Sequence, residues 1–417
     1  MADKIVVPEF GTPVRENWWK RLWKSKATVL SDNTMITVYP FNGSLYTFYE
    51  SPYLHRLDSD LSTVRCEDLT KLNLLSHASH PHYDQEGNMI TLGLSLGLLG
   101  PKYQLTKFLR TPGAPALSSH CRSLASRRCS RMFHPSYMHS FSVTKNYYVL
   151  IEQPLTVSVG RVIKAILKGK SLSTALRWNG DREVVFHLIN RHTKKEHTIK
   201  YFTKAFFFLH TINAYEERGE VVVDICSYDS PAMMDCMFIE KLQTAQSNPD
   251  YAPLFRGRPR RFVLPLQPAM VLQQPRRMEI QPALIADIGC ETPAIHYELF
   301  NGRKYRYFYA ISSDVDADNA GKLIKVDTLT GEFTSWQEEN VYCSEPVFLP
   351  RPEASQEDDG ILVFSVIWGK PHITWTGIVL VDALDLSTVA RVHFQLSGPV
   401  PKPLHGCFIS SWDFIES

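Results

Sequence analysis

Histidine is the residue type in this 417-residue chain with the clearest capacity for chemistry, because fifteen are present and neutral imidazoles bind transition metals well. Their spacing selects no ligand set, since the sequence has neither an H-x-x-x-H helix pattern nor an H-x-H pair beside a cysteine pair. Ligands drawn from distant strands leave no such local signature. Taken alone, each histidine is more often a hydrogen-bonded core residue than a metal ligand.

Four short segments place histidines in surroundings that suit an inward-facing side chain. His80 and His82 fall on one face of an extended stretch, because side chains two residues apart point the same way. His139 and His210 each lie alone within strongly apolar, strand-like sequence. His405 is followed by a glycine, which permits close approach of another backbone. These residues are candidate ligands, and the pattern leaves the choice among them open.

The sequence lacks the motifs of several common classes of enzyme. It has no G-x-x-x-x-G-K-[ST] phosphate-binding loop and no G-x-S-x-G nucleophile turn. The acidic run at 356–360 lacks the carboxylate spacing of an EF-hand, so we interpret it as a solvated turn between two strands. A formal net charge of +2 argues against a dedicated nucleic-acid-binding protein.

The eight cysteines are scattered without a C-x-x-C pair, which is typical of reduced intracellular thiols rather than of a disulfide framework. The N-terminal residues show no signal-peptide pattern. No run of apolar residues approaches the length of about 18 that a membrane-spanning helix needs. We therefore expect a cytoplasmic protein without a spanning helix.

The elements that must position the candidate ligands are mainly strands. Short apolar or alternating runs recur between turn signals, a pattern that predicts an all-β sandwich, barrel or propeller. No internal repeat decides among these three, and one amphipathic helix is predicted at 233–246. The clearest predicted strands lie within 35–50, 146–157, 220–228, 304–312 and 360–369.

Two basic segments stand apart from the strands. Residues 17–26 combine three tryptophans with lysines and arginines, which suits either a helix at a membrane interface or an ordinary surface helix packed by its aromatic residues. Residues 111–131 are rich in serine and arginine and are predicted to form a flexible, solvated loop. Attraction of this loop to anionic lipid is the alternative.

Several stretches, in the same order along nearly the whole chain, resemble the carotenoid cleavage oxygenases, above all their animal branch. The fixed order of many motifs makes this resemblance specific. The stretches are SDNTMITVYP (31–40), ASHPHYDQEGN (78–88), PSYMHSFSVT (135–144), LHTINAYEERG (209–219), RRFVLPL (260–266), WQEENVYCSEPVFLPRPEASQEDDG (336–360), LDLSTVARV (384–392) and LHGCF (404–408).

The resemblance implies a single all-β domain across 1–417, a seven-bladed β-propeller with a helical and loop cap over an axial Fe(II) site. The family's four iron-ligating histidines correspond to His80, His139, His210 and His405, and His82 is not carried over as a ligand. Four neutral imidazoles suit Fe(II), and an octahedral ion then keeps two positions open.

The family's glutamates around these ligands fall on Glu50, Glu291 and Glu345. Each is expected to accept the Nδ1–H of one histidine, which fixes the tautomer and the orientation of the ring. The expected pairs are Glu50 with His139, Glu291 with His210, and Glu345 with His405. Without the resemblance, each glutamate reads as a surface carboxylate.

The activity implied by the resemblance is cleavage of a carotenoid double bond by dioxygen, which yields apocarotenal or retinal products. A rival uses the same iron as a Lewis acid to hydrolyse and isomerise a retinyl ester. A third possibility is a carotenoid-binding propeller without catalysis. The motifs do not separate these three functions.

The implied substrate is a long apolar polyene or retinoid drawn from a membrane, so peripheral attachment to the endoplasmic reticulum or another intracellular membrane is expected. Residues 93–100 and 160–170 fit the apolar, membrane-facing mouth of related enzymes. Phe133, Tyr137 and Tyr49 flank ligand or glutamate positions and are candidate neighbours of the substrate tunnel, although ordinary core aromatics fit as well.

The chain departs from the family at its start. Family members carry further residues ahead of an EFGT motif, here 9–12, and those residues form the first blade. The resemblance therefore implies a propeller that is incomplete at the N-terminus. Residues 13–23 also lack the Pro-Asp-Pro-Cys-Lys motif of many animal relatives, so a palmitoylated anchor is not expected there.

Overall fold

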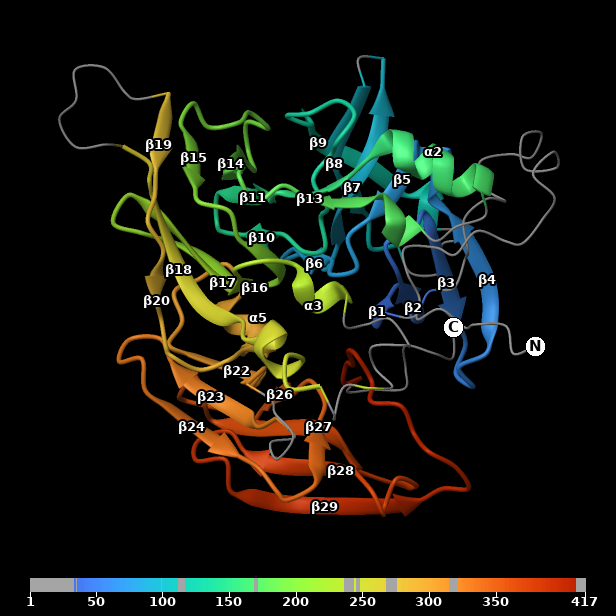
Figure 1. Ribbon diagram of the computed structural model, residues 1–417, viewed down its shortest axis with the longest axis vertical. Helices are drawn as coiled ribbons and strands as arrows, with labels where there is room; N and C mark the ends of the chain where they lie inside the picture. The colour runs from blue at the N-terminus through green and yellow to red at the C-terminus, as the bar shows by residue number, and fades with distance from the viewer. Residues whose placement is uncertain are drawn as a thin grey trace.

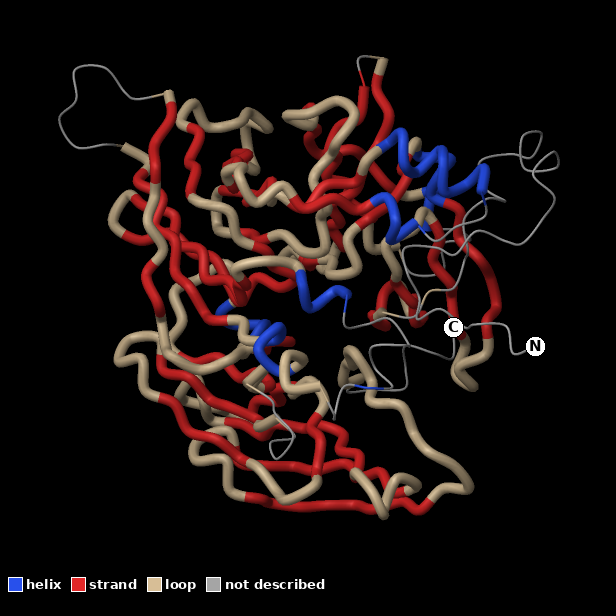
Figure 2. Tube along the Cα trace, viewed as in Figure 1, coloured by secondary structure: helices blue, strands red, loops and turns tan. Residues whose placement is uncertain are grey.

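Strands dominate the fold, which is described from a computed structural model (Figures 1 and 2). This confirms the all-β prediction. The described residues are 34, 36–98, 100–111, 117–168, 172–235, 244, 248–267, 276–314 and 321–409.

Six sheets of four or five strands follow one another along the described chain and are arranged in a ring, the architecture of a β-propeller (Figure 1). The first three sheets comprise β1 (Thr37–Phe41), β2 (Ser44–Phe48), β3 (Tyr53–Leu57) and β4 (Thr63–Asp68); β5 (Leu74–His77), β6 (His82–Tyr83), β7 (Met89–Gly97), β8 (Gly100–Phe108) and β9 (Cys121–Arg128); and β10 (Ser142–Val143), β11 (Tyr147–Glu152), β14 (Val184–Asn190), β15 (Lys200–Thr203) and β19 (Arg277–Glu279).

The other three sheets are built in the same way, with antiparallel neighbours throughout. They comprise β16 (Phe207–Glu217), β17 (Glu220–Tyr228), β18 (Arg258–Pro265) and β20 (Ala283–Leu284); β21 (Glu291–Ala294), β22 (Tyr307–Ile311), β23 (Leu323–Asp327) and β24 (Phe333–Trp336); and β25 (Val341–Cys343), β26 (Val347–Pro350), β27 (Gly360–Trp368), β28 (Trp375–Asp382) and β29 (Thr388–Gln395).

The helices of the described residues are short and lie outside the sheets. A separate two-stranded hairpin, β12 (Leu155–Val157) and β13 (Leu176–Trp178), encloses the longest of them in sequence. These helices are α2 (Val159–Lys168), α3 (Ala232–Asp235) and α5 (Tyr297–Phe300), with 3-10 turns η2 (Leu69–Leu72), η3 (Leu117–Ser119), η4 (Leu172–Ala175) and η6 (Ala252–Phe255).

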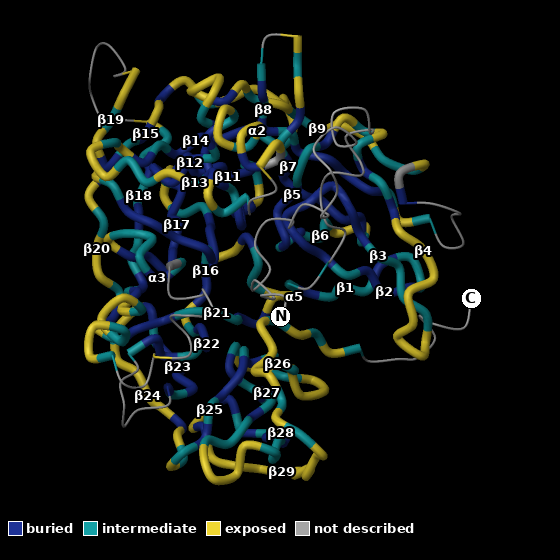
Figure 3. Tube along the Cα trace, turned by 45° about the vertical axis from the view of Figure 1, so that its right-hand side comes forward, coloured by how far each residue is buried: buried dark blue, intermediate teal, exposed yellow. Residues whose placement is uncertain are grey.

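The hydrophobic core lies between the sheets. In β27, Leu362, Phe364 and Val366 are buried and alternate with half-buried neighbours, as the two-residue period of a strand requires. Such faces meet in five apolar clusters, each of which joins two consecutive sheets of the ring. Figure 3 shows the buried residues gathered within and between the sheets, and exposed residues on the outer turns.

One junction of the ring differs from the other five. No apolar cluster of the described residues joins the sixth sheet back to the first. The face of the sixth sheet at this junction is apolar, with Ile378, Val392 and Phe394 exposed. The described residues thus form six multi-stranded sheets, and the seventh blade and the cap over the axis stay predictions.

Most predicted strands are confirmed, and three other predictions need correction or qualification. Residues 121–128 are not a loop: they form β9, because their backbone completes a ladder with β8. The acidic run at 356–360 does join two strands, but Asp358 is buried against Lys325 rather than solvated. The predicted helix at 233–246 is described only over its first residues, as α3. Residues 9–12, 13–23 and 17–26 lie outside the described residues.

A buried ionic network ties the second sheet to the third. His187 on β14 lies between Glu196 and Glu152, at 2.7 and 3.4 Å, and Arg127 on β9 reaches both carboxylates. Burial raises the pKa of Glu152 and of Glu196, but the hydrogen bonds and charges of His187 and Arg127 lower each pKa to about 2. Both carboxylates therefore stabilise the fold in their ionised form.

This network predicts sensitivity to acid. The pKa of each carboxyl is lower in the folded chain than its ordinary value of 4.5, so its contribution is complete above that pH and is lost as the pH falls toward 2. We expect Glu152→Gln to lower the free energy of unfolding at pH 7 by about 3 kcal/mol, since a partner leaves a buried ionic network. The melting temperatures of metal-free wild type and variant should converge as the pH falls.

The matched control is Glu183→Gln, because Glu183 is an exposed carboxylate that pairs with Arg277 at the surface. It should follow the wild-type pH profile of melting temperature. Parallel profiles for wild type and Glu152→Gln between pH 7 and pH 2 would contradict the role given to the network.

Candidate metal centre

The four predicted histidines reach the middle of the ring from separate elements. His80 lies on the segment between β5 and β6, and His139 lies on the segment before β10. His210 is part of β16, and His405 follows β29 at the C-terminal end of the described chain. The four candidates thus come from the second, third and fourth sheets and from the segment after the sixth, and no two of them are near each other in sequence.

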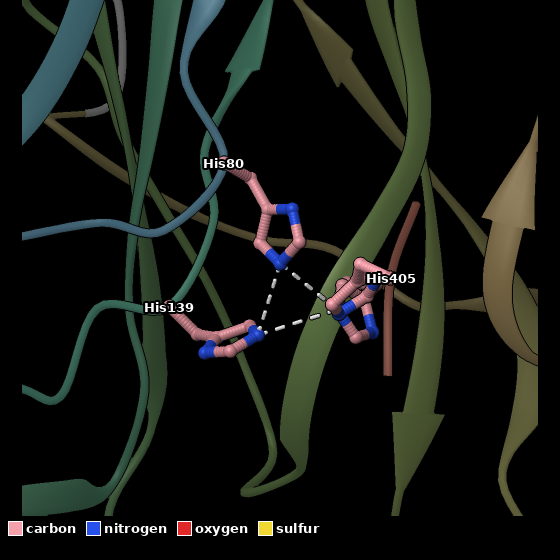
Figure 4. A group of neighbouring side chains, drawn as sticks. His80, His139 and His405 are labelled. Atoms are coloured by element: carbon pink, nitrogen blue, oxygen red, sulfur yellow. Dashed lines mark hydrogen bonds between the residues drawn. The ribbon is translucent and has the colours of Figure 1, made fainter. Parts of the chain in front are cut away.

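The structure brings these four side chains together. The Nε2 atoms of His80, His139 and His210 are mutually 3.2 Å apart. The ring of His405 completes the group, 4.6 Å from His80 and 5.0 Å from His210 between centroids, and one nitrogen of each imidazole lies within 4.8 Å of all the others. Figure 4 shows the rings of His80, His139 and His405 turned toward one another.

A β-bulge re-aims the side chain of His210. The pairing of β16 with β17 is regular up to Phe208 and shifts its register before Thr211, so Leu209 and His210 lie in the irregularity. A bulge bends a strand and changes the direction in which a side chain points. Phe207 and Phe208 on the regular side are fully buried and anchor the strand in the core.

Two predicted glutamates hold their histidines from the buried side. Glu50 hydrogen-bonds Nδ1 of His139 through Oε1, and the same oxygen accepts the hydroxyl of Tyr137 at 2.7 Å. Glu291 lies 2.5 Å from Nδ1 of His210 through Oε2. Because Nδ1–H donates to a carboxylate in both cases, Nε2 is the nitrogen left with a free lone pair.

The backbone beside Glu291 is strained. Thr292 has a φ of 48°, which is costly for a β-branched residue, and a register irregularity of β21 begins at the same place. The Thr292 N–H donates to Oε2 of Glu291 at 2.8 Å, so the unusual backbone fixes the carboxylate that contacts His210. Strain stored at this position is consistent with a functional site.

Glu345 holds the fourth histidine and its neighbour together. Its Oε1 lies 2.9 Å from Nδ1 of His405, and its Oε2 accepts the N–H of Gly406 at 3.0 Å. A Cβ at Gly406 would meet nothing within 4 Å, so close packing does not explain this glycine as the sequence suggested. All three predicted glutamate–histidine pairs are therefore present.

His80 differs from the other three, because no glutamate in the described part of the chain hydrogen-bonds its Nδ1. The Tyr39 hydroxyl on β1 lies 3.3 Å from that nitrogen. Burial first, and then the charge of Glu345, raise the pKa of Tyr39 well above its ordinary value, which keeps the phenol neutral. Burial and the three other imidazoles lower the pKa of His80, so this ring is also neutral.

The donor set fits a transition-metal ion. Neutral imidazoles that donate through Nδ1 direct Nε2 lone pairs into one small space, an arrangement that is repulsive unless a cation lies among them. Adjacent ligand atoms about 2.1 Å from one octahedral ion are about 3 Å apart, which matches the 3.2 Å spacing of three of the nitrogens. Three carboxylates one contact further out balance a divalent charge.

A cleft of about 610 Å³ opens onto the group. His80, His210 and His405 line it, whereas His139 lies behind them. A volume of this size is typical of sites that take small apolar ligands. The apolar and aromatic lining includes Phe141, Ile212, Ala294, Ile295, Phe348, Leu349 and Phe408.

The remaining sequence-based candidates take other roles. His82 is not part of the group, because it contacts the Phe141 carbonyl and the Tyr297 hydroxyl, each at 2.8 Å. Tyr49 and Tyr137 are buried but do not line the cleft, and Phe133 is exposed on the surface, so none is placed as a tunnel neighbour.

Sequence reasoning missed two contacts of the centre. Tyr137 precedes His139 by two residues, and this spacing within strand-like sequence was a usable signal that both side chains meet Glu50. Tyr39 carried no such signal, because it lies 41 residues from His80 on another sheet.

Comparisons with known proteins agree with this geometry. Residues 1–410 match the family described as retinal pigment epithelial membrane protein, RPE65. A carotenoid isomerooxygenase of Galleria mellonella is 42% identical over 98% of this chain and 80% of its own length. The carotenoid isomerooxygenase of Drosophila melanogaster is 36% identical over 98% and 79%, and the β,β-carotene 15,15'-dioxygenase of Gallus gallus is 30% identical over 99% and 83%.

Solved structures share the fold. A chimera of ACO and RPE65 superimposes with a TM-score of 0.73 at 20% identity, over 96% of this chain and 79% of that one. A cobalt-substituted Synechocystis ACO gives 0.72 at 21% identity, over 95% and 78%. With a full-length family match and relatives at this identity, the chain belongs to the RPE65 family of carotenoid oxygenases and isomerooxygenases.

Proposed function

We propose that this chain is a non-haem iron dioxygenase that cleaves a double bond of a carotenoid to give apocarotenal or retinal products. The observation that carries the proposal is the convergence of four imidazoles beside a cleft with apolar and aromatic residues in its wall. Relatives named dioxygenase and isomerooxygenase support an oxygen-using reaction. His80, His139, His210 and His405 would hold Fe(II).

Bound Fe(II) would supply the one-electron chemistry that dioxygen requires for reaction with a closed-shell polyene. The protein's own part is to bind and orient. Cleavage breaks one C=C double bond and the O=O bond of dioxygen, forms two C=O bonds, and neither releases nor consumes a proton. Glu50, Glu291 and Glu345 are all engaged by histidines, which suits a reaction without a general acid or base.

The cleft walls select and position the substrate. Phe141, Ile212 and Phe348 offer apolar surface to a polyene and exclude water from the centre. Because the histidines line one part of the wall, only the bond that lies against them is placed for reaction. Cleft shape would therefore decide which double bond is cleaved.

Two other functions remain distinct alternatives. The same centre acting as a Lewis acid would hydrolyse and isomerise a retinyl ester without dioxygen. A carotenoid-binding propeller without catalysis would need the cleft but not the metal. The names of the relatives favour oxygen chemistry, and two of them join it to isomerisation.

We predict that purified protein reconstituted with Fe(II) retains stoichiometric iron and converts β-carotene to aldehyde products in air. Iron analysis and chromatography that resolves geometric isomers measure both results. His210→Ala should lose both bound iron and aldehyde product, because His210 contacts the His80 and His139 nitrogens and also lines the cleft.

A folded wild-type protein that holds no iron would contradict the catalytic proposal and favour carotenoid binding alone. Product from a retinyl ester under anaerobic conditions would instead assign the isomerohydrolase reaction. The circular dichroism spectrum of His210→Ala should match that of wild type, which shows that the variant is folded.

We predict that Glu291→Gln weakens metal binding about 10–100-fold, because an amide is a poorer acceptor for Nδ1–H of His210 than a carboxylate. A Co(II) titration of metal-free protein measures the affinity. Glu298→Gln is the matched control, since Glu298 lines the cleft but is exposed and lies outside the centre. Equal Co(II) affinities for the two variants would contradict the role of Glu291.

We further propose that the surface around α2 attaches the protein to a membrane. Ile163 and Leu167, one turn apart on α2, are exposed, as is Phe133, whose carbonyl accepts the Val159 N–H. Leu98, at the turn of the β7–β8 hairpin, is fully exposed. Basic residues accompany this apolar set, which suits an interface with anionic lipid. They are Arg161, Lys164 and Lys168.

The proposed attachment is peripheral. No helix among the described residues has the length and apolar character to cross a bilayer. Met132 packs beside Gly100 at the end of the β7–β8 hairpin, and Phe133 contacts the start of α2. The hairpin end, the 132–133 turn and α2 are therefore neighbours, and Figure 1 shows α2 beside the β7–β8 hairpin. We place the protein on an intracellular membrane, consistent with its free thiols.

We predict that the protein floats with liposomes that contain anionic lipid, and that Phe133→Ser with Ile163→Ser reduces the bound fraction several-fold. Less apolar area then enters the interface. Phe333→Ser is the matched control, because Phe333 is also exposed but lies on β24, away from α2. Wild-type protein that stays in the dense fraction with every lipid composition would refute the attachment.

We also propose that a seventh blade fills the junction between the sixth and first sheets. The exposed apolar face of β28 and β29 supports this, since the matching faces of the other sheets are covered by a neighbour.

A further inference from the structure

The centre is asymmetric in the groups that hold its rings. Three histidines, His139, His210 and His405, present Nδ1 to a glutamate. The distance is 2.5 Å for His210 and 2.9 Å for His405. His80 alone presents Nδ1 to a neutral hydroxyl, that of Tyr39, at the longer distance of 3.3 Å. This difference is one of charge as well as of distance.

Tyr39 is held in place by its ring. It packs edge-on against Phe48 with centroids 5.4 Å apart and lies 6.5 Å from the ring of Tyr83. β1 carries it in a register that pairs Tyr39 with Tyr46 of β2. Because these contacts involve the ring rather than the hydroxyl, the position of the oxygen beside His80 does not depend on the hydrogen bond.

We propose that Tyr39 is the positioning residue for His80: its hydroxyl oxygen accepts the Nδ1–H of His80 and turns Nε2 toward the metal. This inference rests on the proposed function. Among the described residues, Nδ1 of His80 has no other hydrogen-bond partner, and its Nε2 already lies 3.2 Å from those of His139 and His210.

A phenol oxygen is a weaker acceptor than a carboxylate, so it leaves the His80 ring less basic and less tightly oriented than the other three. His80 is then the ligand most able to adjust when substrate fills the cleft that both His80 and Tyr39 line. Loss of a group that hydrogen-bonds a metal ligand typically lowers metal affinity about 10–100-fold, and we expect removal of this hydroxyl to lower it about tenfold.

The test is Tyr39→Phe, which deletes the hydroxyl and keeps the ring packed against Phe48. Tyr83→Phe is the matched control, because the Tyr83 hydroxyl donates to the Pro40 carbonyl at 2.7 Å, close to Tyr39 but away from the histidines. Co(II) affinity, the absorption spectrum of the Co(II) form and the melting temperature of metal-free protein are measured for each.

We expect Tyr39→Phe to bind Co(II) about tenfold more weakly and to alter the Co(II) spectrum, with an unchanged melting temperature, while Tyr83→Phe matches wild type in affinity and spectrum. Wild-type affinity and spectrum in Tyr39→Phe would overturn the inference and leave the proposed function standing. An equal loss of Co(II) affinity in both variants, or a lower melting temperature of metal-free Tyr39→Phe, would also overturn the inference. Either result would show that Tyr39 acts through packing rather than through its hydroxyl. Wild type that binds no Co(II) would overturn both.

Discussion

The rest of the structure depends on one constraint, that electron pairs on separate imidazoles must point into the same small volume. Bare lone pairs 3.2 Å apart repel, so the rings need both a cation at their focus and rigid holding from behind. The glutamates and Tyr39 provide that holding by accepting from Nδ1. A ring of sheets is suited to the task, since each sheet approaches the axis from another direction and is fixed by its neighbours.

Local irregularities adapt the regular sheets to this purpose. The bulge around His210 and the positive φ of Thr292 lie on adjacent sheets, and together they bring a histidine and its glutamate into contact. The apolar clusters on both sides of β16 and β17 stabilise the surrounding strands by about 1.5–3 kcal/mol for each large side chain fully buried. Packing therefore sustains strain at the centre that an isolated strand would release.

The chemistry of the site divides between its two sides. Behind the histidines lie buried carboxylates and hydroxyls that fix charge and tautomer. In front lies the cleft, whose apolar and aromatic side chains alternate with polar ones such as Thr211, Asn213 and Asn301. This division separates the residues that would hold a metal from those that would contact a substrate, so the presentation of a substrate depends on the cleft rather than on the ligands.

The sequence by itself determined the strand content, because a two-residue period such as that of β27 is a local property of the chain. Its motifs also identified the four histidines and the three glutamates, through the family resemblance. It misjudged 121–128, whose strand forms only because β8 offers a free edge, and Asp358, whose burial depends on Lys325. Only the tertiary structure decided that Tyr39 faces His80 and that Tyr137 shares Glu50, because such contacts join residues on different sheets and leave no periodic trace in the chain.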